Sequence, residues 1–153
     1  MRFTIVAVGR LRDPAVAEVV ADYAHRASRY WPLDTVEVRD GGGGARPSDE
    51  TRRREGEALL RRAGEALVIA CDESGERMDS RTFAALLQRW REEGRDVAFL
   101  LGGANGLAPE VLRCASRRIS LAPWTLPHEL ARLVLMEQFY RAGTIVRGEP
   151  YHK

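Results

Sequence analysis

Short apolar, β-branched runs alternate with amphipathic helical patterns from one end of this 153-residue chain to the other. The expected strands are Phe3–Val8, Val36–Val38 with its flanks, Ala66–Ala70, Val97–Leu101 and Ile119–Leu121. This alternation predicts an α/β fold, in which a parallel sheet carries helices on both faces. A chain of this length buries enough surface for one domain over residues 1–153, without disulfide or metal support.

Helices are expected between these strands. The first begins at Asp13-Pro14, an N-cap residue followed by proline at the first helical position. The second and third run from about Ser48 to Ala63 and from about Ser80 to Glu93, and a short fourth follows Pro109. The fifth, from about Pro127 to Thr144, is apolar over most of its circumference, so it is either central to the monomer or part of a dimer interface.

Composition excludes several classes of protein. No apolar run approaches the roughly 20 residues of a membrane span, and the N-terminus reads as a buried strand rather than a signal peptide. Cys71 and Cys114 lack the spacing of a zinc site, so we expect free thiols, no metal and a cytoplasmic protein. The net charge of +2 is far below that of a dedicated nucleic-acid-binding domain.

Three segments that follow expected strands are candidates for a ligand site. In an open α/β sheet, ligands bind beyond the carboxyl ends of the strands. Cys71–Glu76 follows the third strand, Gly102–Gly106 the fourth and Leu121–His128 the fifth. The glycine cluster lacks the Lys-Ser/Thr ending of a P-loop and is no GxGxxG fingerprint. Its residues indicate either a ligand-binding loop or only a tight strand-to-helix turn.

Polar residues near and after the fifth helix are candidates for catalysis. His128 lies in the first turn of that helix and is either an acid–base group or a surface histidine. Glu137 and Arg141 are spaced as a helical ion pair, in surroundings that also suit a site. The ending Tyr151-His152-Lys153 suits base stacking and phosphate contact, although most chain ends fray.

Four consecutive glycines, Gly41–Gly44, form the one low-complexity piece of the chain. They predict a flexible surface loop, which is either a plain linker or a segment that orders when substrate binds.

Five segments together closely resemble the RlmH family, the ribosomal RNA large subunit pseudouridine N3-methyltransferases H. They are Val6–Gly9, Leu100–Leu107, Thr125–His128, Arg132–Ala142 and Pro150–Lys153. The resemblance covers essentially the whole chain. It implies N3-methylation of a pseudouridine in helix 69 of bacterial 23S rRNA, on the ribosome, with S-adenosylmethionine (SAM) as methyl donor.

The resemblance also implies a SPOUT-type parallel-sheet domain with a C-terminal trefoil knot, a homodimer, and an active site composed from both subunits. The cofactor-binding positions that it implies are Cys71, Gly102, Leu121, Ala122, Pro123, Trp124, Thr125 and Leu126. This chain departs from the common family pattern at Cys71, at Ala104-Asn105 and in the Gly41–Gly44 run.

The expected catalytic and RNA-facing residues are His128, Arg141, Tyr151 and His152, with Lys153 beside them. One of the two histidines is expected nearest the proton that leaves N3. Two alternatives stay open: a SPOUT enzyme with another RNA target, such as transfer-RNA ribose, and a non-catalytic dimeric α/β module that binds RNA or a nucleotide.

Overall fold

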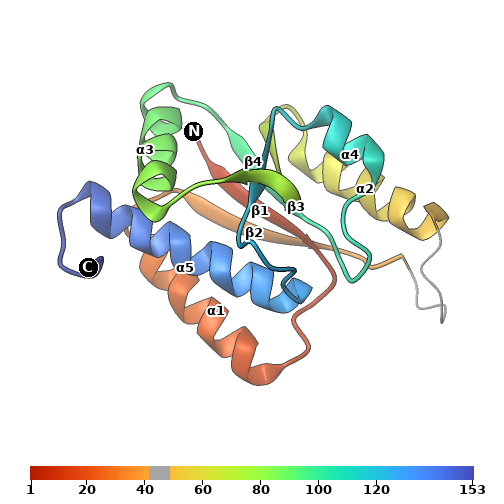
Figure 1. Cartoon of the computed structure of the whole chain (residues 1–153), viewed down its shortest axis with the longest axis horizontal. Helices are drawn as coiled ribbons and strands as arrows, with labels where there is room; N and C mark the ends of the chain where they lie inside the picture. Colours follow the sequence, from red (N-terminus) through yellow and green to blue (C-terminus); the bar gives the residue numbers. More distant parts are fainter. Residues whose placement is uncertain (42–48) are drawn as a thin grey trace.

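The computed structural model describes residues 1–41 and 49–153, which form five strands and five helices (Figure 1). The strands are β1 (Phe3–Val8), β2 (Leu33–Val38), β3 (Leu67–Arg77), β4 (Val97–Leu101) and β5 (Arg117–Ser120). The helices are α1 (Pro14–Ala27), α2 (Asp49–Ala63), α3 (Ser80–Glu92), α4 (Pro109–Cys114) and α5 (His128–Val146).

The strands form one sheet in the order β2-β1-β4-β3-β5, and every pairing is parallel. All five residues of β4 are buried, as their continuous apolar sequence predicts for a central strand covered on both faces. The predicted α/β fold with a parallel sheet is therefore confirmed.

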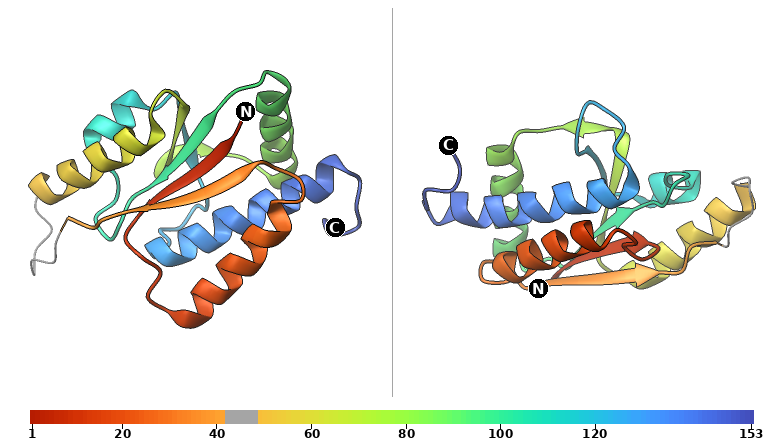
Figure 2. Two further views of the ribbon diagram at one scale, coloured as in Figure 1. Left: turned by 180° about the vertical axis from the view of Figure 1, so that it is seen from behind. Right: turned by 90° about the horizontal axis from the view of Figure 1, so that it is seen from below.

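Two hydrophobic cores lie on opposite faces of the sheet, because successive side chains of a strand point to opposite faces. On one face, Phe3, Ile5 and Phe99 pack with side chains of α1, α3 and α5. On the other face, Val6 and Leu100 pack with side chains of α2 and α4. Figure 2 shows the two groups of helices on either side of the strands.

Helix α5 is central to the first of these cores. It lies between α1 and α3, and Phe139 on α5 makes edge-to-face contacts with Phe3, Phe83 and Phe99. The wide apolar surface of this helix is thus explained in large part by packing within one chain, although Leu130 remains exposed.

Acidic caps define where two helices begin. The Asp13 carboxylate accepts a hydrogen bond from the amide of Ala15 at the start of α1, as predicted from Asp13-Pro14. Asp79 caps α3 in the same way, accepting from the amide of Thr82 at 2.7 Å. Helix α5 follows Pro127 and has no side-chain cap.

Strand β3 is longer than its sequence predicted. It continues through the polar run Asp72–Arg77 after a β-bulge, so that both Cys71 and Glu76 pair with Ile119 of β5. Polar residues are accommodated there because β5 is an edge strand with two arginines, Arg117 and Arg118. Gly75 is required where β3 passes close to the backbone of β5, since a Cβ atom on it would lie 2.5 Å from the carbonyl carbon of Ile119.

Residues 42–48 lie outside the part of the chain that the structure describes. They include most of the Gly41–Gly44 run and the predicted start of the second helix at Ser48. The C-terminal trefoil knot and the single domain over 1–153 stay predictions. Among the described residues, no helix combines the length and apolar character needed to cross a bilayer.

Candidate cofactor pocket and C-terminal cluster

The bulged middle of β3 and the segments that follow β4 and β5 surround a pocket of about 830 Å³. The structure therefore brings together the three segments that the sequence singled out, although Cys71–Glu76 lies within β3 rather than after it. Seven of the eight predicted cofactor positions line this pocket: Cys71, Gly102, Leu121, Ala122, Trp124, Thr125 and Leu126. Pro123 is exposed and is not among the residues that line it.

The glycine cluster after β4 forms a tight turn and a wall of the pocket at once. The amide of Gly106 donates to the carbonyl of Gly103 at 3.1 Å, and Gly106 has a φ of +73°. A Cβ atom on Gly102 would lie 2.5 Å from the carbonyl carbon of Gly106. The sequence left open whether these glycines form a ligand-binding loop or only a tight turn. The two interpretations are compatible, because the turn brings its backbone to the surface of the pocket.

Cys71 lines the pocket with a thiol of low reactivity. Burial raises the pKa of its thiol to about 12, and the neighbouring charge of Asp72 acts in the same direction. The thiol is therefore protonated at neutral pH. Because the thiolate is the nucleophile, this position suits packing rather than covalent chemistry.

Two carboxylates at the pocket were missed as site residues in the sequence. Asp72 and Glu73 line it, and Glu73 accepts a hydrogen bond of 2.7 Å from the Thr125 hydroxyl. Arg52 from α2 also lines the pocket, but its guanidinium is paired with Asp49 at 2.9 Å. The lining therefore suits a ligand that carries positive charge.

His128 and Trp124 lie at the same pocket. His128 is half-buried at the start of α5, where the first-turn amides lack a side-chain cap. The side chain of Trp124 is 80% exposed, which is unusual for the largest apolar residue type. Its position places an aromatic surface at the pocket where a second molecule can contact it.

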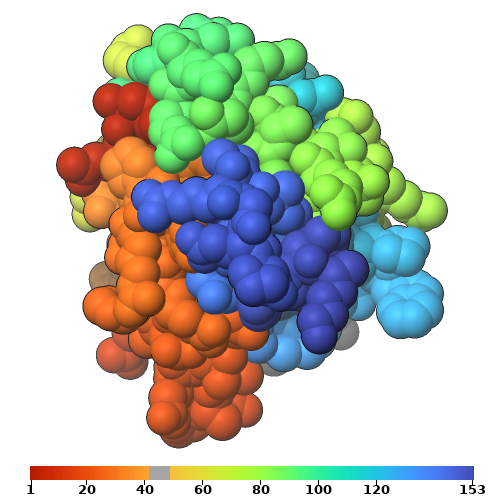
Figure 3. Space-filling view, turned by 90° about the vertical axis from the view of Figure 1, so that its left-hand side faces the viewer, coloured from red at the N-terminus to blue at the C-terminus, as the bar shows by residue number. Residues whose placement is uncertain are grey.

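The other three predicted catalytic residues gather at the opposite end of α5. One carboxylate oxygen of Glu137 lies 2.7 Å from Arg141 Nη2 and accepts a 3.0 Å hydrogen bond from the Tyr151 hydroxyl. The Arg141 guanidinium also lies over the Tyr151 ring, 4.7 Å from its centroid. Figure 3 shows the C-terminal segment, in dark blue, lying on the molecular surface close to α1.

The surroundings of this cluster keep Tyr151 neutral, and the contact with Arg141 selects the tautomer of a neutral His152. Burial, the Tyr23 hydroxyl and Glu137 all raise the pKa of Tyr151, so it stays a neutral phenol. Arg141 Nη1 lies 3.2 Å from His152 Nδ1. A guanidinium only donates, so Nδ1 is the acceptor and a neutral His152 carries its proton on Nε2.

His128 and the C-terminal cluster are far apart within one chain. His128 and Arg141 both lie on α5, thirteen residues apart, which corresponds to about 20 Å at 1.5 Å per residue. A single subunit therefore does not bring the four predicted catalytic residues to one point.

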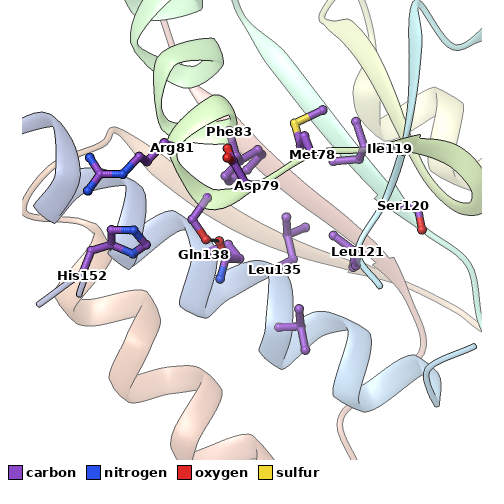
Figure 4. Close-up of a pocket in the computed structure, with 12 residues that line it drawn as sticks. Met78, Asp79, Arg81, Phe83, Ile119, Ser120, Leu121, Leu135, Gln138 and His152 are labelled. Atoms are coloured by element: carbon purple, nitrogen blue, oxygen red, sulfur yellow. Dashed lines mark hydrogen bonds between the residues drawn. The ribbon is translucent and has the colours of Figure 1, made fainter. Parts of the chain in front are cut away.

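A second, smaller pocket of about 390 Å³ lies beside the C-terminal cluster and was not predicted (Figure 4). It is formed by the start of α3, the strand β5, the middle of α5 and His152. Ser120 and Leu121 line both pockets, so the end of β5 and the residue after it separate the two pockets. Within the described residues, no group of three or more His, Cys, Asp or Glu side chains could hold a metal ion.

Comparison with known proteins gives matches over the whole chain. Residues 1–152 match the family model described as "Predicted SPOUT methyltransferase". The "Ribosomal RNA large subunit methyltransferase H" of Gemmatimonas aurantiaca is 53% identical over 154 residues, covering all of both chains. The protein of the same name from Anaeromyxobacter dehalogenans strain 2CP-C is 48% identical over 157 residues, again covering both chains fully.

A solved structure with a similar fold is the tRNA (m1G37) methyltransferase from Aquifex aeolicus. It matches with a TM-score of 0.59 at 15% identity, covering 100% of this chain and 75% of the Aquifex chain. At this identity the likeness concerns the fold alone.

Proposed function

Because the chain belongs to the SPOUT methyltransferases, and among them to the ribosomal RNA large subunit methyltransferase H family, we propose that it methylates 23S rRNA with SAM as donor. The proposed target is N3 of a pseudouridine in helix 69, modified on the ribosome, which places the enzyme in the bacterial cytoplasm. The observation that carries the proposal is the pocket formed by β3 and the segments after β4 and β5, which is lined by seven predicted cofactor positions.

The residues of this pocket fit SAM. Its volume of about 830 Å³ suits a ligand of that size, since small-molecule sites span roughly 300–1,000 Å³. Apolar walls for an adenine ring are available from Leu101, Leu107, Leu112, Leu121 and Leu126. The carboxylates of Asp72 and Glu73 suit the ammonium and sulfonium charges of the cofactor.

When bound, SAM supplies a methyl group already activated on sulfur, which leaves the protein to place the base and manage its proton. N3 must lose its proton to become a good nucleophile, and negative charge then develops on the adjacent carbonyl oxygens. His128 is our candidate for accepting that proton, because it lines the cofactor pocket.

His152 suits a different role. Its Nδ1 is engaged by Arg141, so its free Nε2–H is available as a donor. We propose that this N–H stabilises the carbonyl oxygen that gains charge as N3 is deprotonated. Glu137 positions both Arg141 and Tyr151, since one of its oxygens contacts both side chains.

We further propose that the active site is composed from two subunits of a homodimer. The separation of about 20 Å between His128 and Arg141 along α5 supports this, because the cofactor end of one chain can meet the C-terminal cluster of another. Exposed apolar side chains on α1 and α5, Val19 and Leu130, are available to such an interface.

The direct test is methyl transfer from labelled SAM to ribosomes that lack the modification, followed by nucleoside mass spectrometry of the 23S rRNA. The proposal requires N3-methylpseudouridine in the product. Methylation of transfer-RNA ribose would instead identify a SPOUT enzyme with another target. If calorimetry shows no binding of SAM, the protein would instead be a non-catalytic module that binds RNA or a nucleotide.

A further inference from the structure

The pocket of about 390 Å³ beside the C-terminal cluster has an apolar floor and a polar mouth (Figure 4). Met78, Ile119 and Leu135 belong to the floor, which lies against the edge strand β5. The polar lining comes mainly from the start of α3 and the middle of α5, with Ser120 and His152 beside them. An apolar floor with a few polar groups at one end is the usual composition of a site for a small-molecule ligand.

The polar groups at α3 and α5 are already oriented by one another. The Ser80 hydroxyl donates to Gln138 Oε1 at 2.7 Å, and Gln138 Nε2 donates to Glu137 at 2.7 Å. The Gln138 amide keeps one N–H and one carbonyl lone pair for further hydrogen bonds. A fixed amide with a free donor and a free acceptor complements the hydrogen-bonding edge of a nucleobase.

The mouth of the pocket is lined by one arginine and one carboxylate, Arg81 and Asp79. Arg81 is exposed there and forms no ion pair within the part of the chain that the structure describes. His152 lines the same mouth and carries its free proton on Nε2. Asp79 caps α3 through Thr82, and the pKa of its carboxylate is lowered by these hydrogen bonds and, to a smaller extent, by the charge of Arg81. The Arg81 guanidinium has no hydrogen-bond acceptor among the described residues, and a guanidinium suits a phosphate group.

We propose that this pocket binds one nucleotide of the RNA substrate, with its base on the apolar floor, its edge at Gln138 and its phosphate at Arg81. The inference rests on the proposed function and extends it, since it assigns RNA contacts to Ser80, Arg81 and Gln138. The pocket borders His152, so a nucleotide held there lies next to the cluster that the composite active site would present to the cofactor of the partner subunit.

Binding is tested first with uridine 5′-monophosphate and a short uridine-containing single-stranded RNA, each titrated into the ¹⁵N-labelled protein. We expect saturable shifts of the Gln138 side-chain amide and of the Ser80 and Arg81 backbone amides, with tighter binding of the oligonucleotide. Shifts confined to the larger pocket, or none, would overturn the inference. It would be overturned as well if a side chain of a second copy fills the pocket in a crystal of the dimer.

The functional test compares Arg81→Ala with Arg89→Ala, an exposed arginine farther along α3 that lines neither pocket. Arg81→Ala is expected to raise KM for ribosomes roughly tenfold, as loss of a charged phosphate contact does, with little change in SAM affinity. Arg89→Ala is expected to match the wild type. Equal KM values for the two variants would contradict the nucleotide site.

The two levels of the proposal fail in different ways. If the wild type methylates ribosomes but the titrations and Arg81→Ala show nothing, the nucleotide site is wrong and the enzyme assignment stands. If nucleotides shift the NMR signals of Gln138 and Ser80 but the wild type transfers no methyl group to any RNA, the nucleotide site is supported and the enzyme assignment is wrong.

Discussion

The guanidinium of Arg132 on α5 lies 2.7 Å from the carboxylate of Glu37 on β2 and also donates to the carbonyl of Gly9 at 3.0 Å. Arg132 is only 4% exposed, whereas Glu37 reaches the surface. This pair connects the helix that starts at the cofactor pocket to the edge strand at the far side of the sheet. Its role is therefore to hold α5 in place, although the sequence suggested no such role for Arg132.

Replacing Arg132 by methionine is expected to destabilise the fold by roughly 2 kcal/mol. The change leaves the Gly9 carbonyl without its partner and removes a buried charge-assisted bond, but Glu37 can turn to water, which limits the loss. Urea unfolding measures the difference. Arg12→Ala is the matched control, because Arg12 is exposed and its 3.4 Å pair with Asp40 contributes little. Equal midpoints for both variants would contradict this account.

A second prediction concerns the hydrogen bond between Thr125 and Glu73, which joins the loop after β5 to strand β3 at the cofactor pocket. Thr125→Val keeps the shape of the side chain and removes the hydroxyl, so it is expected to weaken SAM binding roughly fivefold to tenfold. Thr125→Ser restores the donor and is expected to restore affinity. Calorimetry with SAM measures both, and a serine variant as weak as the valine variant would rule out the hydrogen bond as the cause.

The reactivity of the two cysteines follows from their surroundings. With its pKa raised to about 12, Cys71 is about one part in ten thousand thiolate at pH 8, and the fraction grows only as the pH rises toward 12. Cys114 is exposed. Iodoacetamide at pH 8, followed by peptide mass spectrometry, is expected to label Cys114 and spare Cys71, whereas unfolding in urea exposes both.

The same reasoning predicts that Cys71→Ala retains methyl transfer within about threefold, because the thiol contributes packing rather than chemistry. An inactive alanine variant that still folds and binds SAM would show that the thiol takes part in the reaction.

Much of the fold and the larger pocket follows from local sequence pattern. Strand-helix alternation predicts the parallel sheet, and Asp13-Pro14 predicts where α1 begins. The general rule that ligands bind beyond parallel strand ends then places Cys71, Gly102 and Thr125 near one another. Each of these predictions needs only neighbouring residues in the chain and the periodicity of one element.

The features that sequence reasoning missed depend on contacts between distant residues. The polar run Asp72–Arg77 extends β3 only because β5 lies beside it. The second pocket requires α3, α5 and the C-terminal residues to meet, although Ser80 and Gln138 are far apart in sequence. Neither Ser80 nor Gln138 belongs to a sequence pattern that indicates a site. Only the position of these residues in the fold shows that they share a pocket.

Glu137 is predicted to act through the residues that it positions. Glu137→Gln weakens its contacts with Arg141 and Tyr151, so it is expected to lower kcat for methyl transfer by about tenfold or more. SAM affinity should not change, because the cofactor pocket lies at the other end of α5. The control is Glu92→Gln on α3, an exposed carboxylate whose partner is Gln88. A parallel loss of SAM binding in Glu137→Gln would indicate general misfolding instead.

The composite active site makes a prediction that no single variant can test. Gly102→Val places side-chain atoms against Gly106 and is expected to abolish SAM binding. A chain that ends after Pro150 lacks Tyr151 and His152 but keeps the cofactor pocket. Each variant alone is expected to be inactive.

Mixed in equal amounts and allowed to exchange subunits, the two variants should recover about one quarter of the wild-type activity. Half of the dimers are then mixed, and each mixed dimer contains one site that joins an intact pocket to an intact C-terminal cluster of the other chain. If each chain instead used its own cluster, every site would carry one lesion and the mixture would stay inactive. Activity near one quarter therefore requires that the cofactor and the C-terminal residues act from different subunits.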